Sequence, residues 1–193
     1  MKQCLVNILI ATAFLGTTQP LSAQEHVNTL EAHVHGVSEL MIVAEGNALE
    51  IQLKSPAMNL VGFEHKASTS KDIATVEKAA VTLRQHDALF LMSGTDCKQA
   101  NTSVDVSKVM DTDHNDHESS SNDDEHVHEE HDGSHSEIIA NYNYHCKDSA
   151  SLSSITVALF EFFPGIHEIN AMWINQSQQG AITLTPTNRI IKF

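Results

Sequence analysis

Apolar and polar residues alternate along residues 37–54, and a short polar stretch interrupts the alternation near its middle. Alternation with a period of two places the apolar side chains of a β-strand on one face. Gly46 and Asn47, in the interruption, tolerate the positive φ angles of tight hairpin turns. The pattern predicts a β-hairpin that stops at Ser55 and Pro56. Its apolar positions are Leu40, Ile42, Ala44, Leu49, Ile51 and Leu53.

Apolar residues recur at helical spacing in residues 71–86, and Ser70, just before them, is a suitable N-cap. This stretch predicts a helix. Residues 152–163 fit a helix, yet part of the stretch also fits a strand. A possible cap at Asp148 and a stop at Pro164 favour the helix.

Five further short stretches predict strands, at residues 89–92, 104–109, 138–146, 166–174 and 181–185. The order of elements predicts an α+β fold, a single domain of antiparallel strands with two helices. The same order of elements is also compatible with a domain built from two similar halves. We expect residues 111–137, which are rich in His, Asp and Glu, to form a disordered loop that interrupts this domain.

The first 23 residues have the pattern of a secretory signal peptide, with one lysine, an apolar run and cleavage after Ala23. The apolar run is shorter than the roughly 20 residues that a transmembrane helix needs. We therefore expect residues 24–193 to form an exported domain with no membrane insertion after cleavage.

Three cysteines are present, and Cys4 leaves with the signal peptide. The remaining pair, Cys97 and Cys146, predicts a disulfide in an exported protein. The alternative makes both thiols metal ligands. Neither has a second cysteine at the short spacing of zinc-thiolate sites, which favours the disulfide.

The formal charge of −14 is concentrated in residues 111–137, which hold eleven acidic and no basic residues. The rest of the chain therefore carries only −3. Nucleic acid and anionic membranes attract basic surfaces and are poor partners for this chain, so we expect no nucleic-acid binding, whereas cations are favoured.

Six histidines lie within the same acidic stretch. Neutral imidazole binds Zn, Cu, Ni and Fe, and neighbouring carboxylates add oxygen donors. A solvated acidic linker is the alternative, but histidine adds no solubility at neutral pH. We therefore predict metal ligands at His114, His117, His126, His128, His131 and His135.

A second candidate cluster combines His33 and His35 with Glu64 and His65. In an extended strand, His33 and His35 would share one face and could bind one ion together. His86, His145 and His167 stand alone in the sequence, and each is a structural histidine by default.

The segments HVHGVSELMIVAEGNALEIQLKSPAMNLVGFEH, LFEFFPGIHEINAMWI and QGAITLTP, with a cysteine pair that brackets a His/Asp/Glu loop, resemble the ZrgA family of zinc-uptake proteins. The most specific parts are SPAMNLVGFEH and FPG. The resemblance implies a periplasmic protein with zinc-responsive expression, which binds zinc and supports a zinc ABC importer. It also implies a shared folded site at His33, His35, Glu64 and His65, with His167 as a minor candidate.

The predicted function is therefore periplasmic capture of zinc, as cargo, beside an ABC importer or its binding protein. Copper or nickel buffering with the same ligands is the alternative. The chain has no motif of a metalloprotease, serine hydrolase or phosphate loop, so we expect no enzyme. We also expect Cys97 and Cys146 to tether the ends of the loop, and the site near His33, His35 and His65 to hold the ion more firmly.

Overall fold

The computed structural model describes residues 34–111 and 136–193. The predicted signal peptide and residues 112–135 of the predicted loop lie outside the described residues. No helix in the described part of the chain is long and apolar enough to cross a membrane.

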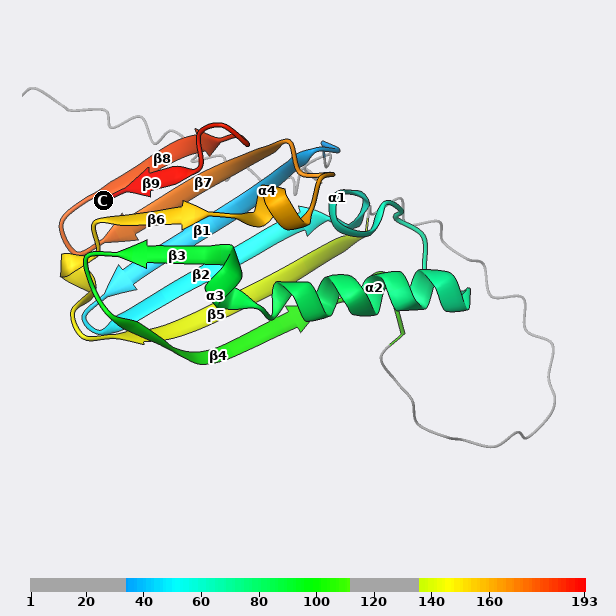
Figure 1. The fold of residues 1–193 in the computed structure, drawn as a ribbon, viewed down its shortest axis with the longest axis horizontal. Coiled ribbons are helices and arrows are strands. Elements are labelled where there is room, and N and C mark those ends of the chain that lie inside the picture. Colours follow the sequence, from blue (N-terminus) through cyan, green and yellow to red (C-terminus); the bar gives the residue numbers. More distant parts are fainter. Residues whose placement is uncertain (1–33, 112–135) are drawn as a thin grey trace, which may run out of the picture. The chain divides into compact units, whose positions relative to one another are not determined.

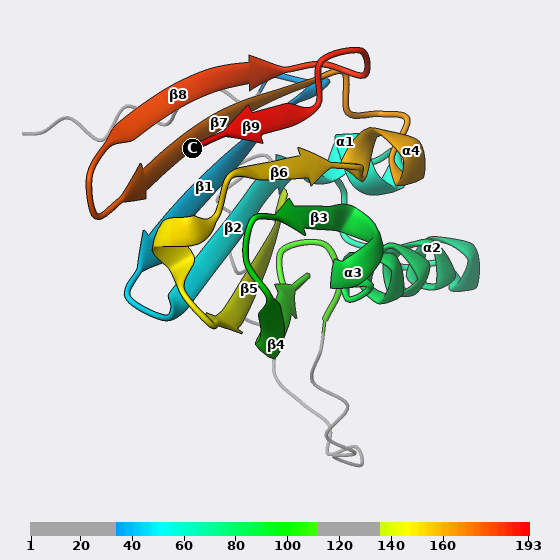
Figure 2. The ribbon, with the colours of Figure 1, turned by 60° about the vertical axis from the view of Figure 1, so that its left-hand side comes forward.

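Two β-sheets form the two layers of the domain (Figures 1 and 2). The strands of the larger sheet are β1 (Val37–Glu45), β2 (Ala48–Pro56), β4 (Cys97–Asp105), β5 (Glu137–Cys146), β7 (Glu168–Asn175) and β8 (Gln179–Leu184). Those of the smaller sheet are β3 (Phe90–Ser93), β6 (Ser154–Val157) and β9 (Ile190–Lys192). Their orders are β4-β5-β2-β1-β7-β8 and β3-β6-β9.

The β1–β2 hairpin lies in the middle of the larger sheet, and its prediction is confirmed. Its six alternating apolar residues are at most 3% exposed, and Gly46 has a φ of 57° in the turn. Every neighbouring pair in this sheet is antiparallel except β1 and β7, which are parallel. Because β5 and β7 flank this hairpin, strands from early and late parts of the chain are interleaved.

The smaller sheet and helix α2 (Ser70–Leu83) cover one face of the larger sheet (Figure 2). Aromatic pairs join the layers: Phe90 packs edge-on against Tyr142 with centroids 5.0 Å apart, and Trp173 against Phe193 at 5.2 Å. The buried Tyr142 hydroxyl donates to the carbonyl of Leu83 at the end of α2, at 2.8 Å. The apolar core therefore lies on this covered face.

Helix α2 begins one residue earlier than predicted, because Thr69 and not Ser70 is its N-cap. The Thr69 hydroxyl accepts from the backbone N–H of Asp72 at 3.1 Å. The helix ends at Leu83, and a separate turn, α3 (His86–Leu89), leads into β3.

The prediction of one helix over residues 152–163 is wrong in its first half. Residues 154–157 form β6, which has β3 and β9 as neighbours on its two sides, and only α4 (Leu159–Phe162) is helical. Alternating burial of Ile155 and Val157 explains the strand. Asp148 caps a short 3-10 helix, η1 (Ser149–Ser151), instead.

The described α-helices are therefore α2 and three short ones, namely α1 (Ala57–Val61), α3 and α4. Mostly antiparallel sheets with short helices agree with an α+β domain. The strand predicted at residues 104–109 is also displaced, since β4 spans Cys97–Asp105 and is followed by a turn.

Cys97 and Cys146 are joined in a disulfide, so neither thiol is a metal ligand. The two cysteines are paired at one end of the β4–β5 hairpin, whereas Asp105 and Ile139 are paired near the other end. The steps from the first to the last of the nine residues of β4, at about 3.3 Å each, put roughly 26 Å between these ends. The connection that contains residues 112–135 leaves β4 at the end remote from the disulfide. The expectation that the disulfide tethers the ends of the loop is therefore wrong.

Candidate metal-binding site

His35 lies in a tight turn just before β1, not in the extended strand that we expected. The backbone N–H of Val37 donates to the carbonyl of Val34 at 3.0 Å, which closes the turn. Gly36 has a φ of 88° there, and a Cβ at this position would lie 2.9 Å from Nδ1 of His167. Both conditions require glycine after His35. His33 lies outside the described residues.

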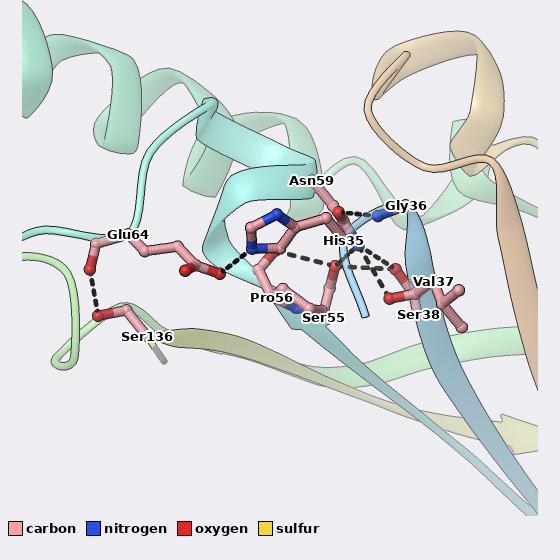
Figure 3. A network of polar contacts seen from close by, with 9 residues as sticks. All are labelled: His35, Gly36, Val37, Ser38, Ser55, Pro56, Asn59, Glu64 and Ser136. Carbon is pink, nitrogen blue, oxygen red and sulfur yellow. Dashed lines mark hydrogen bonds and ion pairs between the residues drawn. The ribbon is translucent and has the colours of Figure 1, made fainter. Parts of the chain in front are cut away.

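Asn59 in α1 holds this turn against the sheet (Figure 3). Its buried amide accepts from the N–H of Gly36 at 2.6 Å and donates to the carbonyl of Val37 at 2.9 Å. Beside it, the hydroxyls of Ser38 and Ser55 are 2.8 Å apart, and both lie within reach of the same amide. The network fixes the backbone next to His35.

Asn59 was not among the residues predicted from the sequence. The sequence does carry a signal for it, namely a single amide in the apolar run that follows Pro56. An amide in such a run is expected to be buried, and a buried amide must find hydrogen-bond partners. The FPG segment also reaches this residue, since a Cβ on Gly165 would lie 2.4 Å from the Asn59 carbonyl oxygen. Residues of the HVHG, SPAMNLVGFEH and FPG segments therefore meet at Asn59, where Gly36 contacts its side chain and Gly165 approaches its backbone.

The structure brings together two of the predicted ligands, His35 and Glu64 (Figure 3). Nε2 of His35 lies 3.0 Å from Oε1 of Glu64, and the side chains are 51% and 17% exposed. Two tetrahedral zinc ligands with bonds of about 2.0 Å lie about 3.3 Å apart. The pair therefore needs little movement to bind one ion, and zinc would replace the proton shared between them.

His65 does not join this pair. Its ring stacks on Phe63 with centroids 4.6 Å apart, and its Nε2 lies 3.7 Å from Oδ2 of Asp72 at the start of α2. The Thr69 hydroxyl, at 2.7 Å from the same carboxyl oxygen, lowers the pKa of Asp72, and His65 lowers it further. Of the three described residues that were predicted to share a site, only His35 and Glu64 contact each other. His65 contacts Asp72 instead.

The described residues that flank residues 112–135 on both sides are held by the chain around Glu64. On one side, the Ser136 hydroxyl contacts the carbonyls of Glu64 at 2.7 Å and Lys108 at 3.1 Å. On the other, Nζ of Lys66 donates to Oδ1 of Asp111 at 2.5 Å and to the carbonyl of Ser107 at 2.8 Å. The six candidate histidines, His114 to His135, lie outside the described residues, but their flanking residues lie beside the His35–Glu64 pair.

Glu137 belongs to the fold and not to the loop in which we predicted it. It is the first residue of β5 and is 8% exposed. Lys54 lies 3.0 Å and Lys108 3.5 Å from its carboxylate oxygens, so two cations balance the buried charge. This carboxylate is therefore a structural group at the base of the loop.

Among residues 34–111 and 136–193, no group of three or more His, Cys, Asp or Glu side chains is arranged to hold a metal ion. The remaining described histidines are dispersed. His86 contacts Asp87 at 2.9 Å, His145 is exposed on β5, and His167 lies against Gly36. A complete ligand set would need donors from beyond the described residues or from solvent.

Comparison with known families gives a match over most of the chain. A family described as "ZrgA family zinc uptake protein" matches residues 32–193, which include the His35 turn, α1, the candidate loop and the FPG segment. No curated protein matches the chain.

Proposed function

The chain belongs to the ZrgA family of zinc uptake proteins, and from this premise we propose that it is an exported protein that captures zinc and assists its uptake beside an ABC importer. Zinc is its cargo and not a catalytic cofactor. In this proposal, the histidines of residues 111–137 collect the ion. The His35–Glu64 pair, with His33 and His65 as further candidate ligands, holds it.

One observation carries the proposal. Ser136 and Lys66 hold the two ends of the histidine-rich segment within hydrogen-bonding distance of residues 64–66, next to the His35–Glu64 pair. The residues that flank the candidate loop ligands are thereby held at the end of the sheet that carries the His35–Glu64 pair. We infer that this attachment favours transfer of an ion from the segment to the pair.

Moderate affinity in the histidine-rich segment suits capture and release. Each ion must order the residues that bind it, and this conformational cost reduces the net binding free energy. Imidazole binds metal only when it is unprotonated, so capture should weaken as the pH falls through about 6.5. Copper or nickel buffering with the same ligands is the alternative, because nitrogen sites generally bind copper more tightly than zinc.

A calorimetric zinc titration of the exported protein, residues 24–193, tests the segment. Replacement of the six histidines from His114 to His135 by alanine should remove most of the bound zinc and leave the circular dichroism spectrum unchanged. His145→Ala, an exposed histidine on β5 near the disulfide, is the control and should keep full stoichiometry. Equal stoichiometry in the six-histidine variant would rule out the segment as the collecting site.

Single substitutions test the folded pair. His35→Ala and Glu64→Gln should each weaken the tightest phase of the titration, whereas His33→Ala and His65→Ala measure how far the site extends. If the tight phase survives in all four variants, these residues are structural. Competition among Zn, Cu, Ni and Mn then decides between the zinc proposal and its alternative.

The proposed location is the periplasm, reached through the signal peptide of residues 1–23. Cell fractionation with N-terminal sequencing of the exported form tests it, and the expected first residue is Gln24. A chain that stays in the cytoplasm with Met1 intact would contradict this part of the proposal.

A further inference from the structure

The second face of the larger sheet carries a contiguous apolar patch at β1, β7 and β8. The patch consists of Met41, Val43, Met172, Ile174 and Ala181. Met41 lies directly beside Met172 and Val43 beside Ile174 in the parallel β1–β7 pairing, while Ala181 faces Met172 from β8. Residues directly opposite in neighbouring strands share a face, so the five side chains form one surface.

This surface is exposed in the described part of the structure. Met41, Met172 and Ile174 are 47%, 51% and 47% exposed, although they occupy the middle of a six-stranded sheet. The smaller sheet and α2 cover the other face, and no described element crosses this one (Figure 2). Ile42, Trp173 and Gly180 also line a shallow groove of about 540 Å³ at the patch.

Carboxylates border the apolar patch on its β1–β2 side. Glu39 and Glu45 lie on β1 at both ends of the run that contains Met41 and Val43, and Glu50 of β2 is paired with Val43. All three are exposed. Lys54 of β2, which is paired with Glu39, contacts the buried carboxylate of Glu137 at 3.0 Å. On the β8 side, Gln179 and Thr183 carry no charge. We call Glu39, Glu45 and Glu50 the acidic rim.

We propose that this apolar patch with its acidic rim is the docking surface for a partner protein whose own contact surface has apolar side chains flanked by lysine or arginine. A contiguous exposed apolar patch bordered by polar residues is typical of protein interaction sites. Charged groups at the rim determine which partners approach and how fast. The acidic rim therefore selects a basic partner.

The same charges disfavour a second copy of this chain as the occupant. A two-fold contact through this patch would bring two acidic rims together, and each chain also carries a formal charge of −14. The proposal goes beyond zinc capture, because the patch shares no residue with the His35–Glu64 pair. Zinc binding should therefore survive loss of the docking surface.

Methionine oxidation locates the contact, since the two exposed methionines of the described residues both lie in the patch. With dilute hydrogen peroxide, Met41 and Met172 should oxidise faster than the half-buried Met58, Met92 and Met110. A synthetic ten-residue peptide of alternating leucine and lysine should slow oxidation of Met41 and Met172. Oligolysine of the same length, which supplies charge without apolar contacts, should not protect them.

Affinity for the leucine–lysine peptide, measured by fluorescence anisotropy, gives the second readout. Met41→Ser with Met172→Ser should weaken binding about tenfold, because two apolar contacts are lost. The matched control replaces Val81 and Leu91, 57% and 52% exposed elsewhere, by serine and should bind as the unaltered protein does. Glu39→Gln, Glu45→Gln and Glu50→Gln together should reduce the salt dependence of binding.

Four outcomes would overturn the proposal. Resistance of Met41 and Met172 to oxidation in the isolated monomer would mean that the protein's own chain covers the patch. A dimer in sedimentation that the two methionine substitutions dissociate would identify a second copy as the occupant. Equal peptide affinity in the patch and control variants, or equal protection by oligolysine, would show that the patch binds no apolar partner.

Discussion

At one end of the β4–β5 hairpin a disulfide joins Cys97 to Cys146, whereas at the other end hydrogen bonds around Glu64 and Lys66 hold the chain. The disulfide end is closed covalently and also carries the Lys147–Asp96 ion pair. The other end, which we call the site end, holds the flanks of the histidine-rich segment and the His35–Glu64 pair. The difference separates two tasks: the disulfide stabilises the fold, and weaker polar contacts position the candidate ligands.

The largest expected effect comes from removal of the disulfide. Cys97→Ser with Cys146→Ser opens a loop with a sequence separation of 49, and the chain-entropy relation predicts a loss of about 4 kcal/mol in the free energy of unfolding. Urea denaturation measures this loss. Zinc affinity of the folded variant should stay unchanged, because the disulfide lies at the remote end of the hairpin. Loss of zinc binding before unfolding would contradict the separation of tasks.

Asn59 gives the next largest effect and belongs to the site end. Asn59→Ala leaves the N–H of Gly36 and the neighbouring serine hydroxyls without this amide, which should cost about 2 kcal/mol. The substitution should also weaken the tightest phase of the zinc titration, because the turn that carries His35 loses its hydrogen bonds to the Asn59 amide.

A matched amide lies at the opposite end of the β1–β2 hairpin. Asn47 donates to the carbonyls of Cys146 and Lys147, each at 3.1 Å, from an exposed turn. Asn47→Ala should cost less than about 1 kcal/mol and leave the zinc titration unaltered. Equal effects of the two substitutions on zinc binding would remove the distinction between the ends.

The β1–β2 hairpin was predictable because its alternation is local and long. The strand β6 was not, since four residues with apolar spacing compatible with a helix became a strand only through pairing with β3 and β9. The predicted position of β4 was wrong for a different reason. It is an edge strand with mostly exposed side chains, so burial leaves almost no pattern in its sequence.

The disulfide pairing followed from the number of cysteines, but its distance from the loop depended on where β4 begins. Similarly, the family resemblance identified His35 and Glu64, and the structure showed that they touch. The contacts of Ser136 with Glu64 and of Asp111 with Lys66 join residues 72 and 45 positions apart. Contacts at such separation depend on the packing of whole elements and leave no local signal.

The N-cap of α2, also at the site end, should have a smaller effect on the free energy of unfolding. Thr69→Ala removes the N-cap and should cost about 1 kcal/mol, whereas Ser70→Ala should have almost no effect. Thr69→Ala should also raise the pKa of Asp72, because the Thr69 hydroxyl is the main cause of its lowered value.

The pH dependence has a definite sign. A lowered pKa in the folded state means that the ionised Asp72 stabilises the fold above about pH 4, and that this contribution is lost as the pH falls through the lowered pKa. In Thr69→Ala the acid-induced loss should therefore be smaller. NMR titration of the Asp72 carboxyl with urea denaturation at several pH values measures both. An unchanged pKa would assign the lowering to His65 instead.

The smallest stability effect, and the most direct comparison of the two ends, comes from two lysines that each contact one aspartate. Lys66 contacts Asp111 at the site end, and Lys147 contacts Asp96 at the disulfide end, each at 2.5 Å. Lys66→Met and Lys147→Met change the net charge equally, so any general effect of charge on zinc attraction is the same in both. Exposed ion pairs contribute little to stability, and urea denaturation should barely distinguish the variants.

Zinc titration should separate them clearly. Lys66→Met releases the point where the histidine-rich segment leaves the fold, and should weaken zinc binding by up to about tenfold, the lower end of what residues that orient metal ligands contribute. Lys147→Met should bind zinc like the unaltered protein, because the ion pair it breaks lies at the far end of the hairpin. If both lysines change zinc binding equally, charge and not the position of the segment controls capture, and the site end loses its special role.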